Sequence, residues 1–253
     1  MSDWTKKFFG EDYARAYPRD DLTESQVEGA MELLGIAPPP PPSPPLRVLD
    51  LACGYGRHTL SLHKQGFRAF GLDNAWNLLE RAGRDTQSAG LGIAPPFTCA
   101  DMRVLPYASE AFDAVVSLFT SFGYFDDEAD DQTVLDEVAR VLKPGGRFFL
   151  DVLNKEWLMA HFDERFWEEG EGAKLLNEMV FDYEGGRLNT KRTIIPDEGE
   201  RTVLYSSIRL YTMAEMTRML RTAGLTYRKA YGDYAGKRYD MEGFRMIVVA
   251  EKA

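Results

Sequence analysis

The segment from residue 47 to residue 59, RVLDLACGYGRHT, constrains the fold of this chain more than any other. Val48, Leu49 and Leu51 form an apolar run that is typical of a strand covered on both faces. Gly54 and Gly56 follow, and residues 57–65 predict a helix whose free N–H groups point back at the glycine turn. This order of strand, turn and helix predicts an α/β fold with a nucleotide-like ligand at the turn.

A second predicted strand, residues 69–73, ends in an acid. The carboxylate of Asp73 suits hydrogen bonds from the hydroxyls of a ribose. A dinucleotide fingerprint would place a third glycine where Thr59 stands, so the turn favours a cofactor without a pyrophosphate. An NAD-dependent oxidoreductase is the alternative that shares this strand, turn and acid.

Four further segments follow the glycine turn in sequence order. They are 71–73 (GLD), 99–102 (CADM), 112–117 (FDAVVS) and 141–150 (VLKPGGRFFL). Together with residues 48–56, they resemble the motifs of class I S-adenosylmethionine-dependent methyltransferases, and the resemblance extends over residues 47–151. It implies that S-adenosylmethionine is the cofactor. It also implies a Rossmann-like sheet of seven strands in which a reversed final strand lies beside the fifth.

The resemblance further implies which residues contact the cofactor. The backbone of residues 52–56 would approach the methionine moiety, and Asp50 would orient its ammonium group. Asp73 would accept the ribose hydroxyls and Asp101 the adenine amino group. Arg57 either pairs with the cofactor carboxylate or lies exposed on its helix. The full set of expected contacts is Asp50, Ala52, Cys53, Gly54, Gly56, Arg57, Asp73, Asn74, Asp101, Met102, Ser117 and Leu118.

Methyl transfer from a sulfonium is an in-line displacement, so its main demands are alignment of the reacting atoms and exclusion of water. The catalytic candidates are Tyr124, which follows the predicted fourth strand, Tyr17 and His161. We expect a small-molecule acceptor that is methylated at nitrogen or oxygen. Residues 117–125 lack the Asn/Asp-Pro-Pro-Tyr pattern of the enzymes that methylate amino groups of nucleic acids.

Composition limits the partners. A formal net charge of −10 disfavours binding to nucleic-acid phosphates. No stretch reaches the roughly 20 apolar residues of a membrane span, and residues 1–7 lack the apolar region of a signal peptide, so we expect a cytoplasmic protein. Cys53 and Cys99 are expected to be buried. No histidine has a metal-ligand spacing with a cysteine or another histidine, so no metal site is expected.

Three parts are expected along the chain. Residues 1–45 combine an N-terminal helical segment, in which residues 23–26 form a capping box, with a proline run. Seven of the eight residues from Pro38 to Pro45 are proline, which predicts a stiff spacer of roughly 25 Å. Alternatively, the run docks an SH3-like partner, as it would in a scaffold protein without catalytic activity.

Residues 46–154 and 211–253 are expected to form the methyltransferase core, in which a helix over residues 75–89 turns Trp76, Leu79 and Ala82 inward. The remaining part, residues 155–210, is expected to be an antiparallel β insert. Its three predicted strands are 175–183, 187–195 and 201–210. Three strands alone are marginal in water, so the insert must pack on something. It therefore forms either a lid over the acceptor or a contact in a homodimer.

Overall fold

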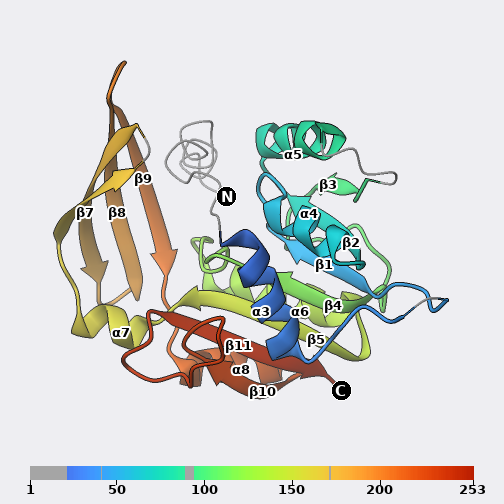
Figure 1. The fold of residues 1–253 in the computed structure, drawn as a ribbon. Helices are drawn as coiled ribbons and strands as arrows, with labels where there is room; N and C mark the ends of the chain where they lie inside the picture. The colour runs from blue at the N-terminus through green and yellow to red at the C-terminus, as the bar shows by residue number, and fades with distance from the viewer. Residues whose placement is uncertain (1–21, 41, 89–93, 171) are drawn as a thin grey trace.

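A computed structural model describes residues 22–40, 42–88, 94–170 and 172–253 of the chain. Tyr17 and the rest of the expected N-terminal segment before Leu22 lie outside these residues. Within the described part, the strands form two sheets, one of seven strands and one of four (Figure 1).

The seven-stranded sheet has the order β10-β11-β5-β4-β1-β2-β3. Strands β1 to β5 are mutually parallel where they pair, whereas β11 runs antiparallel to both of its neighbours, β5 and β10. The expected reversed final strand beside the fifth is therefore confirmed. The strands are β1 (Arg47–Leu51), β2 (Arg68–Asp73), β3 (Phe97–Cys99), β4 (Phe112–Ser117), β5 (Leu142–Leu153), β10 (Leu225–Tyr231) and β11 (Arg245–Lys252).

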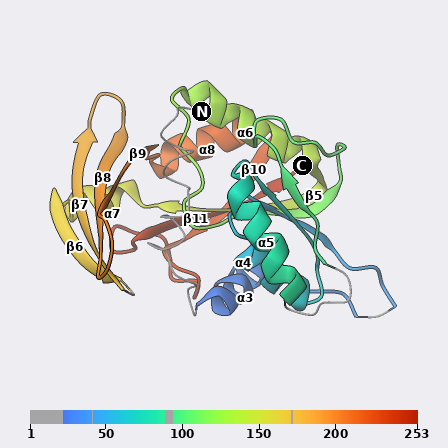
Figure 2. The ribbon, with the colours of Figure 1, turned by 90° about the horizontal axis from the view of Figure 1, so that it is seen from above.

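Helices cover both faces of this sheet (Figure 2). Successive residues of β1 point to opposite faces, so Val48 packs with α3 and α4, while Leu49 packs with α6 and α8. This double coverage explains the near-continuous apolar run of β1. The helices are α3 (Thr23–Leu34), α4 (Arg57–Lys64) and α5 (Trp76–Ser88) on one face, and α6 (Glu128–Val141) and α8 (Met213–Thr222) on the other.

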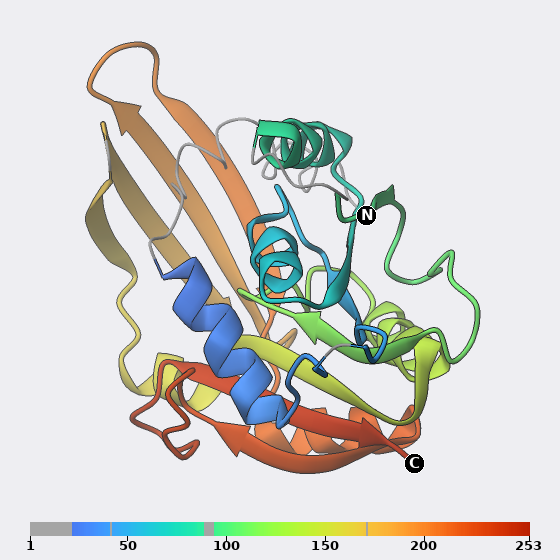
Figure 3. The same ribbon diagram turned by 45° about the vertical axis from the view of Figure 1, so that its right-hand side comes forward.

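The insert stands beside the large sheet as a separate antiparallel sheet of order β6-β7-β8-β9 (Figure 3). The expectation of three strands is wrong in number, because β6 precedes them. Along β7, buried residues alternate with exposed or half-buried ones, so the sheet has one covered face. The insert consists of α7 (Lys155–Ala160), β6 (Arg165–Gly170), β7 (Ala173–Asp182), β8 (Arg187–Pro196) and β9 (Thr202–Arg209).

Three local expectations are wrong. Trp76 is 62% exposed, because the buried stripe of α5 passes through Leu78, Leu79, Ala82 and Thr86 instead. Cys99 is exposed on the short outermost strand β3. The capping box is also absent: Leu22 is the N-cap of α3 and makes no side-chain cap.

In the proline run, the Ser43 N–H donates a hydrogen bond of 3.1 Å to the Pro40 carbonyl oxygen. The expected stiff spacer includes Pro41, which lies outside the described residues. Among the described helices, none is both long and apolar enough to cross a membrane.

Candidate functional site

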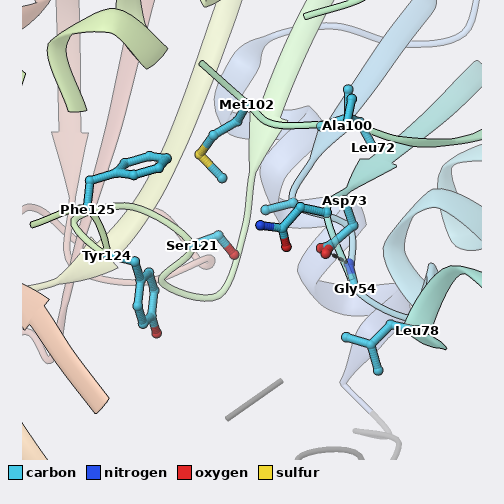
Figure 4. Close-up of a pocket in the computed structure, with 11 residues that line it drawn as sticks. Gly54, Leu72, Asp73, Leu78, Ala100, Met102, Ser121, Tyr124 and Phe125 are labelled. Carbon is cyan, nitrogen blue, oxygen red and sulfur yellow. Dashed lines mark hydrogen bonds between the residues drawn. The ribbon is translucent and has the colours of Figure 1, made fainter. Parts of the chain in front are cut away.

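A pocket opens where β1, β2 and β4 end, at the carboxyl edge of the parallel strands (Figure 4). Five of its lining residues are among those expected from sequence: Ala52, Gly54, Asp73, Asn74 and Met102. The other lining residues are Leu72, Leu78, Ala100, Ser121, Tyr124 and Phe125. Of these additional residues, only Tyr124 was singled out individually in the sequence, while Leu72 and Ala100 fall within the motif segments 71–73 and 99–102. Ser121 and Phe125 reach the pocket through the conformation of the loop after β4.

Asp73 ties the end of β2 to the glycine turn after β1. The Gly54 N–H donates to Asp73 Oδ2 at 2.8 Å (Figure 4). The Ala75 N–H donates to Oδ1 of the same carboxylate at 2.8 Å. Burial raises the pKa of the Asp73 carboxyl, and these backbone hydrogen bonds oppose that shift. The acid and the turn therefore form one unit at the centre of the pocket.

The two turn glycines have different surroundings. Gly54 has φ of +56°, and a Cβ built there has its nearest heavy atom at 4.0 Å, on Leu78. Gly56 has φ of +76°, but a Cβ there falls 2.6 Å from the Phe97 ring. Gly54 thus leaves open space at the pocket, whereas Gly56 allows close packing behind it.

Asp50 lies beneath the pocket and is not part of its lining. It is buried, and the Thr59 hydroxyl donates to Asp50 Oδ2 at 2.6 Å. Burial raises the pKa of Asp50 to about 6, against the opposing effect of the Thr59 hydrogen bond. Thr59, which replaces the third glycine of a dinucleotide fingerprint, therefore uses its hydroxyl to hold this acid.

Asp101 and Arg57 have protein partners. Arg103 donates to Asp101 Oδ2 at 2.7 Å, and the Arg103 interaction outweighs burial and lowers the Asp101 pKa. Arg57 donates to the side-chain oxygens of Thr23 at 2.8 Å and Gln26 at 3.1 Å, so it joins α4 to α3. The remaining expected contacts, Cys53, Gly56, Ser117 and Leu118, are buried and do not line the pocket.

A larger cavity of about 560 Å³ lies between the core and the insert. Tyr124 lines both this cavity and the first pocket, so the two spaces meet at its side chain. The volume is that of a typical small-molecule site. The other lining residues are Phe119, Thr120, Leu153, Trp157, Leu158, His161, Asp163, Phe166, Glu168, Met179, Leu188, Thr190, Arg192, Ser206, Ile208, Phe244 and Arg245.

His161 lines the cavity from the end of α7, and its ring is held in one orientation. The ring stacks on Trp157 at a centroid distance of 4.6 Å, and Nδ1 lies 2.9 Å from the Trp157 carbonyl oxygen. A carbonyl oxygen only accepts, so Nδ1 carries the proton of this hydrogen bond. In the neutral ring, Nε2 is then the atom with the free lone pair.

The turn after β4 is strained and firmly anchored. Phe119 and Thr120 have φ of +61° and +60°, a region that costs non-glycine residues roughly 1–3 kcal/mol each. The buried carboxylate of Asp151 accepts the Phe119 N–H at 2.9 Å and the Tyr234 hydroxyl at 2.7 Å. Arg245 pairs with the same carboxylate at 3.0 Å. This anchor has no local sequence signal, because its members come from three distant segments.

The insert is hydrogen-bonded to the loop that contains Tyr124, where the two spaces meet. The Arg209 N–H donates to the Gly123 carbonyl at 2.8 Å, and Arg187 Nη1 donates to the Phe125 carbonyl at 2.8 Å. These bonds fix both sides of Tyr124. The insert therefore shapes the first pocket as well as the second cavity.

Comparisons with known proteins agree with this geometry. Residues 48–146 match the family model described as a methyltransferase domain. The chain is 28% identical over 213 residues to the cypemycin N-terminal methyltransferase of a Streptomyces species, covering 81% of this chain and 82% of that protein. It is also 25% identical over 211 residues to the putative methyltransferase YqeM of Bacillus subtilis, covering 82% and 84%.

Solved structures share the whole fold. The CcbJ methyltransferase of Streptomyces caelestis matches with a TM-score of 0.82 at 18% identity, over 99% of this chain and 97% of that chain. The sugar N-methyltransferase KedS8 of a Streptoalloteichus species matches with a TM-score of 0.68 at 20% identity, over 96% and 92%.

The fold and the motifs are those of a class I S-adenosylmethionine-dependent methyltransferase, and residues 48–146 match a methyltransferase domain. The protein is an enzyme whose cofactor is S-adenosylmethionine. The antiparallel strand β11 and the family match decide against the NAD-dependent oxidoreductase.

Proposed function

We propose that the protein transfers the methyl group of S-adenosylmethionine to a nitrogen atom of a small molecule bound between the core and the insert. The observation that carries this proposal is the position of Tyr124, which lines both the pocket at the glycine turn and the 560 Å³ cavity. A cofactor in the first space and an acceptor in the second would meet at this residue. Oxygen is the alternative acceptor atom.

In this proposal, the cofactor occupies the pocket at the ends of β1, β2 and β4. Asp73 holds the turn at Gly54 and offers its remaining acceptor capacity to the ribose hydroxyls. Ala100 and Met102 lie where the resemblance places the adenine. The relatives support nitrogen as the acceptor atom, since two of them are named as an N-terminal and a sugar N-methyltransferase.

Catalysis would then consist mainly of alignment. Tyr124 borders both ligands, and the insert covers the acceptor as a lid. His161 is the proposed proton acceptor, because its Nε2 is the basic atom of the neutral ring. A neutral amine attacks the methyl group first and releases its proton afterwards, so the base need not act before the transfer.

The test is methyl transfer with a blocked cavity. Thr190→Trp places a large ring on the inner face of β8, whereas Asn189→Trp places the same ring on the exposed outer face and serves as the matched control. Release of S-adenosylhomocysteine is first measured across a panel of amines and alcohols to find an acceptor. Mass spectrometry of the product then identifies the methylated atom.

We expect Thr190→Trp to lose activity with every acceptor while binding S-adenosylhomocysteine normally, and Asn189→Trp to keep both properties. Full activity in Thr190→Trp would show that the acceptor binds elsewhere. A product methylated on oxygen would be consistent with the proposed cavity but would show that the acceptor atom is oxygen and not nitrogen.

A further inference from the structure

The part of the acceptor cavity that β8 and β9 line has a group of neighbouring polar side chains. Thr190 of β8 pairs directly with Ser206 of β9, and Arg192 lies two residues beyond Thr190 on the same face of the sheet. All three line the cavity. Leu188 and Ile208, in the next row of the same face, line it with apolar surface.

Arg192 is held in place by a buried neighbour. Its Nε donates to Asn177 Oδ1 at 2.7 Å, and Asn177 is only 1% exposed. Asn177 Nδ2 has no hydrogen-bond partner among the described residues, so the amide is buried at a cost that the packing of β7 alone does not explain. The hydrogen bond from Arg192 explains why Asn177 is buried there: it immobilises the guanidinium group. An immobilised guanidinium loses less entropy on binding a ligand.

Arg192 shares the cavity with three other charged side chains, Arg245, Asp163 and Glu168. Arg245 is paired with the buried carboxylate of Asp151. Asp163 and Glu168 also line the cavity, but both are exposed, and Asp163 caps the Arg165 N–H at 3.0 Å. Exposed carboxylates are screened by water and salt, whereas the position of Arg192 is fixed by the sheet.

We propose that Arg192, Thr190 and Ser206 form a subsite for an anionic oxygen group, a carboxylate or a phosphate, on the methyl acceptor. A guanidinium presents its N–H donors in a planar fork that matches both groups. The two hydroxyls add donors beside it, and the row with Leu188 suits an apolar body between the anion and the methylated atom. This inference rests on the proposed acceptor cavity and names the class of molecule that occupies it.

The probes are phenylacetate, phenyl phosphate and the neutral phenylacetamide, each titrated into the protein saturated with S-adenosylhomocysteine. We expect at least one anion to bind about tenfold more tightly than the amide, the effect of one charge-assisted hydrogen bond. The comparison of phenylacetate with phenyl phosphate identifies the preferred anion. Equal affinity for all three probes, or no binding of any of them, would overturn the proposal.

A matched pair of variants locates the effect. Arg192→Met removes the cation from the cavity, while Lys191→Met removes the same charge from the outer face, where Lys191 pairs with Glu178 at 2.6 Å. The preference for the anion should disappear in Arg192→Met and persist in Lys191→Met. A loss of equal size in both variants would indicate a general charge effect and contradict the subsite.

A milder variant guards against misfolding. Thr190→Val keeps the shape of the side chain and removes its hydroxyl, so we expect it to weaken binding of the anion several-fold and leave the amide unchanged. Titration of S-adenosylhomocysteine into the same samples tests the cofactor pocket separately. If the wild type shows no preference for the anion while Thr190→Trp still blocks methyl transfer, the proposed subsite is wrong and the proposed acceptor cavity is retained.

Discussion

Three carboxylates that were all assigned to the cofactor have different roles in the fold. Asp73 accepts two backbone N–H groups and lines the pocket. Asp50 is buried under the pocket with Thr59, and Asp101 is paired with Arg103. Of the three, only Asp73 combines an anchored carboxylate with access to the pocket. Single substitutions should therefore distinguish the roles of these three carboxylates.

We predict that Asp73→Ala weakens binding of S-adenosylhomocysteine by roughly 1.5–3 kcal/mol, the range for losing a hydrogen bond to a charged group. Asp101→Ala is the comparison, and we expect a smaller effect, because its carboxylate is occupied by Arg103. Isothermal titration calorimetry measures both affinities. An unchanged affinity in a folded Asp73→Ala variant would remove this acid from the cofactor site.

Asp131 predicts a pH dependence of stability. Burial raises its pKa from 3.8 to about 6, although the Tyr211 hydroxyl donates to it at 2.7 Å. The folded state therefore binds this proton more tightly than the unfolded state, so stability is lost as the pH rises from about 4 to about 6. The cost above that range is on the order of 2–3 kcal/mol.

Asp131→Asn keeps an acceptor for Tyr211 without the buried charge. We expect its free energy of unfolding in urea to exceed that of the wild type by on the order of 2 kcal/mol at pH 8, with little difference at pH 4. Asp131 also faces Arg187 and Arg209. A less stable variant at pH 8 would show that attraction to these two arginines outweighs the cost of burial.

At the scale of elements, the glycine turn supports a paired prediction. Gly56→Ala combines a left-handed backbone with a Cβ 2.6 Å from Phe97, so we expect it to lose about 2–4 kcal/mol of stability. Gly54→Ala meets open space and should lose only about 1 kcal/mol, while binding of S-adenosylhomocysteine is strongly reduced. Urea unfolding and calorimetry distinguish the two effects. Normal cofactor binding by Gly54→Ala would place the ligand away from the turn.

The elements that were predicted from sequence are those with a strong local signal. The runs of β1 and β4 are apolar on both faces, and the glycine turn occurs in only a few folds, so the order and direction of the core strands follow from them. Strand β6 was missed because its sequence, RFWEEG, has neither a long apolar run nor a clear alternation. Its structure depends on pairing with β7, which is a tertiary effect.

The candidate site was predictable only where it depends on the backbone. Asp73 is the last residue of β2, and Gly54 and Met102 lie within three residues of the ends of β1 and β3, so their positions are set by the sheet. Ser121 and Phe125 lie in a loop whose shape depends on the distant Arg187 and Arg209. A sequence pattern contains no information about such contacts.

For the whole molecule, we predict the effect of deleting residues 155–210. The deletion removes Arg187 and Arg209, which hold the loop around Tyr124. We therefore expect an affinity for S-adenosylhomocysteine about tenfold lower, together with loss of methyl transfer. The single variant Arg187→Met should show part of the same decrease in affinity for S-adenosylhomocysteine.

The same deletion tests the role of the insert as a lid. We expect the native mass, measured by light scattering, to be unchanged. The outer face of the insert does expose apolar side chains in a row that includes Trp167, Leu176 and Val203. A fall from dimer to monomer on deletion would show that this face is an interface between two copies, and the lid would then be at most a second role.

The position of β11 inside the large sheet separates the order of synthesis from the order of assembly. Strand β5 ends at Leu153, but its partner begins at Arg245, after the insert and α8 have been made. Until then, residues 147–153 of β5 present an unpaired edge, which is the kind of surface on which nascent chains aggregate. Closing so long a loop is also slow, so the last strand should limit the folding rate of the core.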